Sequence, residues 1–398
     1  MAVIETVDRI EPTLLSEAPS EITDVVAELS AKAAILGSAL HPQAASNLAD
    51  LVRIMNTYYS NLIEGHHTRP RDIERALSGE LDQDDERRNL QLEAKAHVRV
   101  QAEIDRLFAD GRLPDPTSSD FILNLHLSFY RDAPESMLLI KGAGREFRME
   151  PGQWRSLPEH DVAVGQHLPP SSERVPDFMR YFERRYELKG LGRGSRILAL
   201  PAAHHRLNYI HPFPDGNGRV SRLMSHAMAH TAGIGAHGLW SVSRGLARGI
   251  ESGGEYKRMM DSADMPRQND LDGRGNLSLQ ALKDFTLWFL RVCLDQVNFM
   301  SGLFEIDALA QRYRKFVAQS RNLKPESSRL LEEALVRGEF DRGEISRITG
   351  LPERTARRVL TDVLAEGLLG SSTPKGSVSL RFPSEALEAL LPRLYVQA

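Results

Sequence analysis

The chain has 398 residues, with 50 Lys or Arg against 54 Asp or Glu, so its formal net charge is −4 at pH 7. This length allows two or three domains with buried cores, and the slight acidity argues against binding nucleic acid over most of the surface. A single cysteine, Cys293, excludes an internal disulfide framework, and no apolar stretch approaches membrane-spanning length, so we expect a cytoplasmic protein without a membrane partner. We divide it into an N-terminal helical region (1–110), a central region (111–320) and a C-terminal region (321–398).

The N-terminal region contains a predicted helix, at about 45–65, that ends in a glutamate. Apolar residues recur at helical spacing from Ala45 to Ile63. Ser60 lies in the last turn, and Glu64 and Gly65 follow it. Taken alone, Glu-Gly is an ordinary C-terminal stop of a helix.

Residues 145–165 of the central region predict a short β-hairpin in an otherwise helical part of the chain. Aromatic and β-branched residues alternate there with Pro-Gly and Gly, which are typical of turns. A plain surface hairpin is the simplest interpretation.

The segment 211–222 reads His-Pro-Phe-Pro-Asp-Gly-Asn-Gly-Arg-Val-Ser-Arg. Pro212 biases His211 toward an extended backbone, so we expect this histidine on a loop. A solvent-accessible imidazole is mostly neutral near pH 7 and can accept a proton from a hydroxyl. Gly216 and Gly218 permit a turn in which backbone N–H groups surround an anion.

Apolar residues at helical spacing from Arg219 onward place this turn at the N-terminus of a helix, where phosphate is favoured. Arg219 and Arg222 are three residues apart and project from the same side, and two guanidinium groups indicate a polyphosphate. Asp215 offers the hard oxygen that Mg²⁺ prefers. The segment therefore predicts a base, a metal ligand and a phosphate clamp, with a polar loop that caps a core helix as the alternative.

These twelve residues resemble, position by position, the signature of the Fic family, His-x-Phe-x-Asp/Glu-Gly-Asn-Gly-Arg-x-x-Arg. The resemblance implies a mainly α fold, with an all-helical core and a β-hairpin flap. It also implies an enzyme that transfers a nucleotide monophosphate, usually AMP from ATP, to a Ser, Thr or Tyr hydroxyl of a target protein. The related Doc branch usually has lysine where Gly218 stands, so the glycine favours nucleotidyl transfer.

The resemblance also implies a role for each residue of the loop. His211 would deprotonate the target hydroxyl, and Phe213 would anchor the loop in the core. Asp215 would hold Mg²⁺ on the α- and β-phosphates. Asn217 and the backbone of Gly216 and Gly218 would contact the α-phosphate. Arg219 and Arg222 would contact the β- and γ-phosphates.

Two further segments are similar to parts of this family. Ser60 to Gly65 resembles the inhibitory motif, and its place before the catalytic loop is the arrangement called class II. The resemblance implies that Glu64 pairs with Arg222 and blocks the productive pose of ATP, while Ser60 helps to fix the helix end. Residues 145–165 resemble the flap that pairs with the backbone of a target segment.

His226 and His230 lie four residues apart on the predicted helix after the loop, a spacing that could bind zinc in principle. No glutamate follows the first histidine as it does in His-Glu-x-x-His. We therefore interpret them as a solvated or packed pair of histidines.

The C-terminal region predicts three helices, at 327–335, 342–350 and 352–365, and then a hairpin that runs through Lys375 to 378–382. Helix, turn, helix and wing are typical of a winged helix-turn-helix module. DNA contacts would come from the start of the third helix and from the wing tip, that is from Arg354, Thr355, Arg357, Arg358 and Lys375. The nearly balanced charge weakens this interpretation, so protein contacts or a homodimer remain the alternative.

We therefore predict an autoinhibited protein adenylyltransferase that uses ATP and Mg²⁺ to modify a target protein, and itself as a further substrate. Transfer of UMP or phosphocholine, or removal of AMP with Glu64 orienting a water, remains open, because the phosphate clamp does not select the nucleobase. A DNA-binding regulator that senses a nucleotide is a second interpretation. A structural scaffold would leave Asp215 and the two arginines without a reason to converge.

Overall fold

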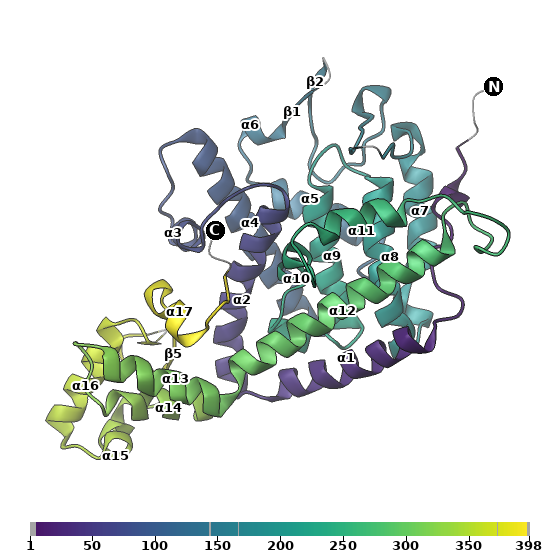
Figure 1. Cartoon of the computed structure of the whole chain (residues 1–398). Coiled ribbons are helices and arrows are strands. Elements are labelled where there is room, and N and C mark those ends of the chain that lie inside the picture. The colour runs from purple at the N-terminus through teal and green to yellow at the C-terminus, as the bar shows by residue number, and fades with distance from the viewer. Residues whose placement is uncertain (1–4, 143–144, 166, 372, 396–398) are drawn as a thin grey trace. The chain divides into compact units, whose positions relative to one another are not determined.

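The computed structural model describes residues 5–142, 145–165, 167–371 and 373–395. Within these ranges the chain is mainly α-helical, with a two-stranded and a three-stranded sheet (Figure 1). The α-helices are α1 (Ser20–Ser38), α2 (Pro42–Ile63), α3 (Pro70–Leu77), α4 (Asp85–Ala109), α5 (Ser119–Tyr130), α6 (Glu135–Leu138), α7 (Val175–Tyr186), α8 (Arg193–Ile210), α9 (Asn217–Thr231), α10 (Val242–Arg248), α11 (Glu255–Ala263), α12 (Leu279–Phe304), α13 (Ile306–Gln319), α14 (Ser327–Arg337), α15 (Ile345–Thr349), α16 (Glu353–Ala365) and α17 (Leu387–Leu390). The strands are β1 (Leu139–Gly142), β2 (Arg145–Arg148), β3 (Glu339–Phe340), β4 (Leu369–Gly370) and β5 (Val378–Leu380). Short 3₁₀ helices are η1 (Val7–Ile10), η2 (Pro158–His160), η3 (Ser172–Arg174), η4 (Leu188–Gly190), η5 (Ala236–Gly238), η6 (Arg342–Glu344) and η7 (Ser384–Ala386).

The chain divides into two compact units. The first comprises Met1–Ala31, Asn56–Gly235 and Ser241–Gln296, and the second comprises Lys32–Met55, Ala236–Trp240 and Val297–Ala398. The boundary between the units passes through α1, α2 and α12. The ranges 1–110, 111–320 and 321–398 therefore remain a prediction from the sequence. None of the helices in the described ranges is long and apolar enough to cross a bilayer.

The core of the first unit is built on α8 and α9, which pack against each other, and α4 and α5 pack against α9. Residues from Ile197 to Ile210 and from Asn217 to His230 are buried almost without interruption. A helix that is buried on nearly all sides has little freedom to move. The short loop 211–216 joins these two helices, so both of its ends are fixed by the core.

The helix predicted between Ala45 and Ile63 is α2, which begins three residues earlier. Gly65 follows it with a φ of 83°, a backbone conformation that glycine adopts at little cost. The N–H of Gly65 donates to the carbonyl of Leu62 at 3.0 Å, and that of His66 donates to Asn61 at 2.9 Å. These bonds end the helix and hold Glu64 at its last turn.

The hairpin lies earlier in the chain than predicted. Strands β1 and β2 pair antiparallel, with Leu139 opposite Arg148, whereas the sequence placed the whole hairpin at 145–165. Beyond β2 the chain is irregular, apart from η2 and an isolated bridge between Val164 and His167. The reason is that Arg155 is drawn into the core, with only 1% of its surface exposed, so this stretch cannot lie as a free strand.

The C-terminal part of the second unit contains the helices and strands that the sequence predicted. Helix α14 is followed by β3, then by helices α15 and α16, and then by β4 and β5. The three strands form a small antiparallel sheet of order β3-β5-β4, in which Phe340 pairs with Val378 and Leu369 pairs with Leu380. The assignment as a winged helix-turn-helix remains a prediction. Of its proposed DNA contacts, Thr355 is half-buried and the others are exposed: Arg354, Arg357 and Arg358 on α16, and Lys375 between β4 and β5.

Candidate active site

His211 ends α8 in a left-handed conformation, with φ 50° and ψ 61°. The extended backbone expected from Pro212 is therefore wrong, because the N–H of His211 still donates to the carbonyl of Leu207 at 3.0 Å and completes the last turn of the helix. A left-handed conformation costs a residue with a Cβ about 1–2 kcal/mol. Surrounding contacts must offset this cost.

Arg155 supplies such contacts. Its Nε donates to the carbonyl of His211 at 2.7 Å and its Nη2 donates to that of Ile210 at 3.1 Å, while its backbone N–H donates to Pro212 at 2.9 Å. Its Nη1 donates to Ser172 Oγ at 2.9 Å. Burial lowers the pKa of Arg155 to about 10, so the guanidinium stays charged at neutral pH. Sequence reasoning did not single out this residue, because an arginine within a stretch of loop and strand character gives no sign of its partners.

The His211 imidazole is half-buried, where the sequence suggested an accessible one. Burial lowers the pKa of His211 to about 4, and the positive charge of Arg155 and the presence of His167 act in the same direction. The ring is therefore neutral at pH 7 and can accept a proton.

Phe213 anchors the loop in the core. Its ring is fully buried and stacks on His126, with 3.9 Å between centroids, and Trp154 lies against it at 4.8 Å. His126 Nδ1 accepts the N–H of Gly152 at 2.9 Å, and burial lowers the pKa of His126 to about 4. A neutral imidazole that accepts at Nδ1 carries its proton on Nε2, which lies 3.3 Å from the carbonyl oxygen of Asp215 and donates to it.

The Asp215 carboxylate is half-buried, and its Oδ2 accepts a hydrogen bond of 2.7 Å from the Tyr130 hydroxyl. Burial and the charge of Asp215 raise the pKa of Tyr130 well above its usual value, so the phenol remains a donor. Gly216 follows with a φ of 80°, and a Cβ at this position would lie 2.7 Å from the Tyr130 oxygen. The donor set, one oriented hard carboxylate beside a backbone turn, fits a Mg²⁺ ion that is shared with phosphate oxygens.

Asn217 closes the loop on itself. Its Oδ1 accepts the N–H of Phe213 at 2.9 Å, and its Nδ2 donates to the carbonyl of the same residue at 2.8 Å. The side chain thus fixes the path between Phe213 and the start of α9. Contact of Asn217 with an α-phosphate remains a prediction.

Arg219 is 4% exposed and lies within a small network of charge. Its Nη2 donates to Glu93 Oε2 of α4 at 2.8 Å and lies 3.2 Å from His66 Nδ1, and its guanidinium carbon lies 5.6 Å from the centre of the Phe129 ring. The buried Nε of Arg219 has no hydrogen-bond partner among the described residues. Glu93 was not predicted, because nothing in the sequence shows that α4 packs on α9.

Arg222 is held by the end of α2. Its Nε donates to Ser60 Oγ at 2.9 Å, and its Nη2 donates to the Ser60 carbonyl at 3.2 Å and to Glu64 Oε1 at 2.5 Å. Burial opposes ionisation of Glu64, but Arg222 and Arg219 keep the pKa of this carboxyl below its usual value. Gly218 makes room for the pair, since a Cβ there would lie 2.4 Å from Glu64 Oε1. Ser60 thus contacts Arg222 directly, which the sequence did not suggest.

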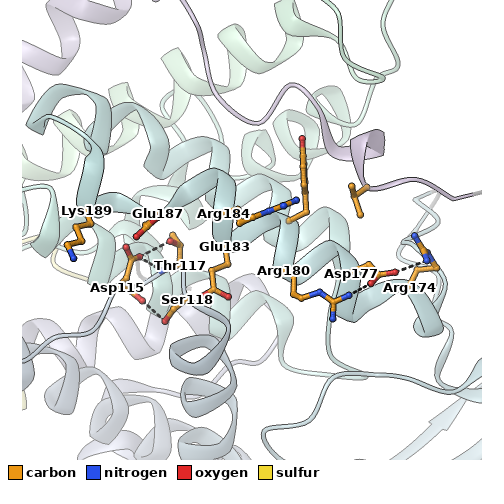
Figure 2. A pocket seen from close by; sticks show the side chains of 12 residues that line it. Asp115, Thr117, Ser118, Arg174, Asp177, Arg180, Glu183, Arg184, Glu187 and Lys189 are labelled. Carbon is orange, nitrogen blue, oxygen red and sulfur yellow. Dashed lines mark hydrogen bonds and ion pairs between the residues drawn. The ribbon is translucent and has the colours of Figure 1, made fainter.

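A separate groove of about 690 Å³ lies along α7 and the segment before α5 (Figure 2). Several of its polar side chains engage one another: Asp177 pairs with Arg174 and Arg180, and Asp115 accepts from Thr117. None of the catalytic-loop residues lines it. The candidate site is therefore the loop 211–216 with the start of α9, and not this groove.

Known proteins resemble the part of the chain that holds this loop. Residues 116–229 match the model of the Fic/DOC family. The chain is 35% identical over 85 residues to a protein named protein adenylyltransferase Fic from Drosophila erecta, and 36% identical over 91 residues to one of the same name from Nematostella vectensis. These matches cover 21% and 23% of the chain, and they span only 17% and 21% of the relatives.

Two solved structures share the fold. A Fic family protein from Desulfovibrio desulfuricans G20 aligns over 92% of this chain and 98% of its own, with a TM-score of 0.53 and 18% identity. Fic-1 from C. elegans aligns over 72% of this chain and 73% of its own, with a TM-score of 0.51 and 15% identity. The mainly α-helical fold is thus that of Fic proteins. Residues 116–229 of this chain therefore form a Fic/DOC domain.

Proposed function

We propose that this chain is a protein adenylyltransferase, which transfers AMP from ATP to a hydroxyl of a target protein and is inhibited by its own Glu64. The observation that carries the proposal is the convergence, at the start of α9, of a neutral imidazole, an oriented carboxylate and two buried arginines. Similarity to proteins named protein adenylyltransferase Fic supports the choice of reaction. Because the chain spans only a small part of those relatives, the proposed activity is argued from the geometry of the candidate site.

In this proposal the neutral His211 accepts the proton of the target hydroxyl while the hydroxyl oxygen attacks the α-phosphorus of ATP. The bond from this phosphorus to the bridging oxygen of the β-phosphate breaks, and pyrophosphate leaves. The proton remains on the imidazole until solvent removes it. Arg155 keeps the His211 ring in place, since it holds the carbonyls on both sides of the residue.

Charge neutralisation comes from the start of α9. The guanidinium groups of Arg219 and Arg222 would bind the polyphosphate, where their positive charge would stabilise the leaving group. Asp215, oriented by Tyr130, would hold Mg²⁺, and the ion would supply further positive charge to stabilise the phosphates. The phosphates are thus bound by residues that the fold has already positioned.

Inhibition follows from the charge of Glu64. Its carboxylate lies 2.5 Å from Arg222 Nη2, in the space above Gly218. A γ-phosphate that approached Arg222 would meet this negative charge at close range, which disfavours the pose. Loss of the carboxylate would leave the Arg222 guanidinium, still held by Ser60, without a negatively charged partner, so it could pair with the phosphate.

The test is intact-mass spectrometry of the parent, Glu64→Gly and Glu64→Gly/His211→Ala proteins after incubation with Mg²⁺ and ATP. We expect the mass of one or more AMP groups on the Glu64→Gly protein alone, as a result of self-modification. Glu80→Gly, which removes an exposed glutamate of the same unit, is the matched control and should behave as the parent.

Parallel incubations with UTP and with CDP-choline distinguish the related transfers, which differ in the mass added. AMP on the His211→Ala double variant would refute the role of His211. A gain in protein mass with UTP or CDP-choline, but not with ATP, would assign the corresponding transfer instead of AMP transfer. Loss of AMP from a modified target only when Glu64 is present would instead favour removal of AMP.

A second candidate function, DNA binding by the C-terminal helices, is favoured by the exposed Arg354 and Arg358 on α16. Arg357 is less available, because it pairs with Glu353 one turn earlier. Electrophoretic shift of a random-sequence duplex library by the parent, and a loss of this shift on Arg354→Ala/Arg358→Ala, would support this function. Concentration-dependent dimerisation that the same substitutions abolish would favour the homodimer instead.

A further inference from the structure

A buried cluster of three metal-binding side chains lies at the opposite end of α9 from the catalytic loop. His226 and His230 are one turn apart on α9, and Asp105 reaches them from α4. The Asp105 Oδ1 lies 2.6 Å from His226 Nε2 and 2.9 Å from His230 Nε2, and the two Nε2 atoms are 3.2 Å apart. The side chains are 10%, 6% and 1% exposed.

Hydrogen bonds alone do not satisfy all three side chains of this cluster well. A carboxylate oxygen only accepts hydrogen bonds, so both histidines must carry a proton on Nε2 to donate to Asp105. The two N–H groups then crowd onto the same carboxylate oxygen, with their nitrogens 3.2 Å apart. If either proton is removed, that nitrogen presents a lone pair to the negative carboxylate instead. A cation at the centre resolves the conflict, because all three atoms can direct lone pairs at it.

We propose that Asp105, His226 and His230 bind a divalent transition-metal ion, in the first place Zn²⁺. Zinc binds imidazole nitrogen and carboxylate oxygen at about 2.0–2.2 Å. The distances between the three atoms are all well below twice this length, so one ion can reach all of them. Two histidines four apart on a helix provide a common pair of zinc ligands, and the third comes from another element. A tetrahedral site completed by a water would require Asp105 Oδ1 to move a few tenths of an ångström away from the two nitrogens.

The surroundings hold the ligands in this orientation. Phe108 of α4 stacks on the His230 ring, with 4.6 Å between centroids and 27° between planes. Gly235 lies against the Nδ1 edge of this ring, and a Cβ at this position would be 2.4 Å from His230 Nδ1.

From the sequence, His226 and His230 were interpreted as a solvated or packed pair, whereas here they are proposed to be metal ligands. The spacing of the histidines was visible, but Asp105 lies more than a hundred residues earlier and only the packing of α4 on α9 brings it to them. The bound ion would join the helix that carries Glu93 to the helix that carries Arg219 and Arg222. It would therefore stabilise the phosphate clamp without contacting the nucleotide. The proposal does not depend on the reaction that the catalytic loop performs.

The test measures metal in the full-length protein, produced with a tag that contains no histidines and purified without chelators. Inductively coupled plasma mass spectrometry should find about one zinc per chain. Asp105→Asn and His230→Gln should each reduce this content at least about tenfold. His67→Gln, which removes an exposed histidine of the same unit, should retain the full content. A parent protein with no more zinc than Asp105→Asn would overturn the proposal.

A second variant and a second measurement keep the test valid if a substitution impairs folding. His226→Cys replaces one zinc ligand by another, so it should retain the metal that His226→Gln loses. The apoprotein reloaded with Co²⁺ should show the visible absorption of a four-coordinate ion. Removal of the metal by a chelator should lower the Tm by roughly 5–10 °C, and Zn²⁺ should restore it. No cobalt spectrum and an unchanged Tm in the parent would refute the site.

Discussion

Glu64, at the end of α2, places a carboxylate oxygen 2.5 Å from the Nη2 atom of Arg222 on α9, 158 residues later in the chain. The same guanidinium donates twice to Ser60, one turn before Glu64. Arg222 is therefore bound to the α2 end at three points and is 1% exposed. Under the proposed function, a phosphate would use this arginine fully only after Glu64 withdraws.

Glu64→Gly should raise the rate of AMP incorporation at least about tenfold, which corresponds to roughly 1.4 kcal/mol of activation free energy. The reason is that the substitution removes the negative charge that competes with the γ-phosphate for Arg222. The measurement is the initial rate of incorporation from labelled ATP. Glu64→Gln keeps the size and removes the charge, so it should show most of the gain. Equal rates for the parent and both variants would mean that the ion pair does not limit activity.

The effect of Glu64 should depend on Arg222. Arg222→Ala should raise the KM for ATP, because it removes a ligand of the leaving phosphates. Glu64→Gly added to Arg222→Ala should then change the rate by less than about twofold, since the partner of the carboxylate is gone. A double-mutant cycle on kcat/KM provides the comparison. If Glu64→Gly activates the Arg222→Ala protein as strongly as the parent, Glu64 acts by another route.

The catalytic loop could be read from the sequence because its residues are contiguous. His211, Asp215 and Arg219 lie within nine positions, and the start of a helix orders them. The pairing of Glu64 with Arg222 is not visible from spacing, and the prediction of it depended entirely on resemblance to a family. The local arrangement of the loop was therefore predictable, whereas its chemistry remains a prediction. A contact between distant elements needed outside information.

The supporting residues could not be predicted for the same reason. Tyr130, Glu93 and Arg155 lie on three different segments, and each acts through a partner that only the packing of helices provides. The hairpin was misplaced because turn residues at 151–152 resemble the end of a strand pair. In the structure this turn precedes the point at which Arg155 enters the core. Periodicity predicts which face of an element is buried, but not what covers it.

Stability should fall as the pH drops from about 6.5 toward 4. Burial lowers the pKa values of His97 and His204 to about 3 and that of His126 to about 4, so these rings are neutral in the folded protein. In the unfolded chain they take up protons below about pH 6.5. The unfolded state then binds more protons, and the free energy of unfolding decreases by up to about 4 kcal/mol per pH unit for three such groups.

Urea denaturation followed by circular dichroism between pH 4.5 and 7.5 measures this dependence. His67→Gln is the control, since His67 is exposed and its loss should leave the slope unchanged. A free energy of unfolding that stays constant between pH 5 and 6.5 would show that the buried histidines do not remain neutral.

Arg155 should control the position of His211 and not the binding of ATP. Its guanidinium holds the carbonyls of Ile210 and His211, and its backbone N–H holds that of Pro212, which fixes a left-handed residue that is otherwise unfavourable. In the Glu64→Gly background, Arg155→Lys should lower kcat roughly 10- to 100-fold, because an ammonium group cannot make the same forked set of bonds. The KM for ATP should change little, since Arg155 contributes no phosphate ligand.

The pH profile separates this positioning role from general damage to the fold. The Arg155 charge helps to keep the pKa of His211 at about 4, so Arg155→Met should move the acid limb of the kcat/KM profile to higher pH, whereas Arg155→Lys should move it less. Arg184→Lys, at an exposed position on α7, is the matched control for both measurements. A loss of ATP binding that equals the loss of kcat would assign Arg155 to the nucleotide site. An unshifted acid limb in Arg155→Met would show that its charge does not act on His211.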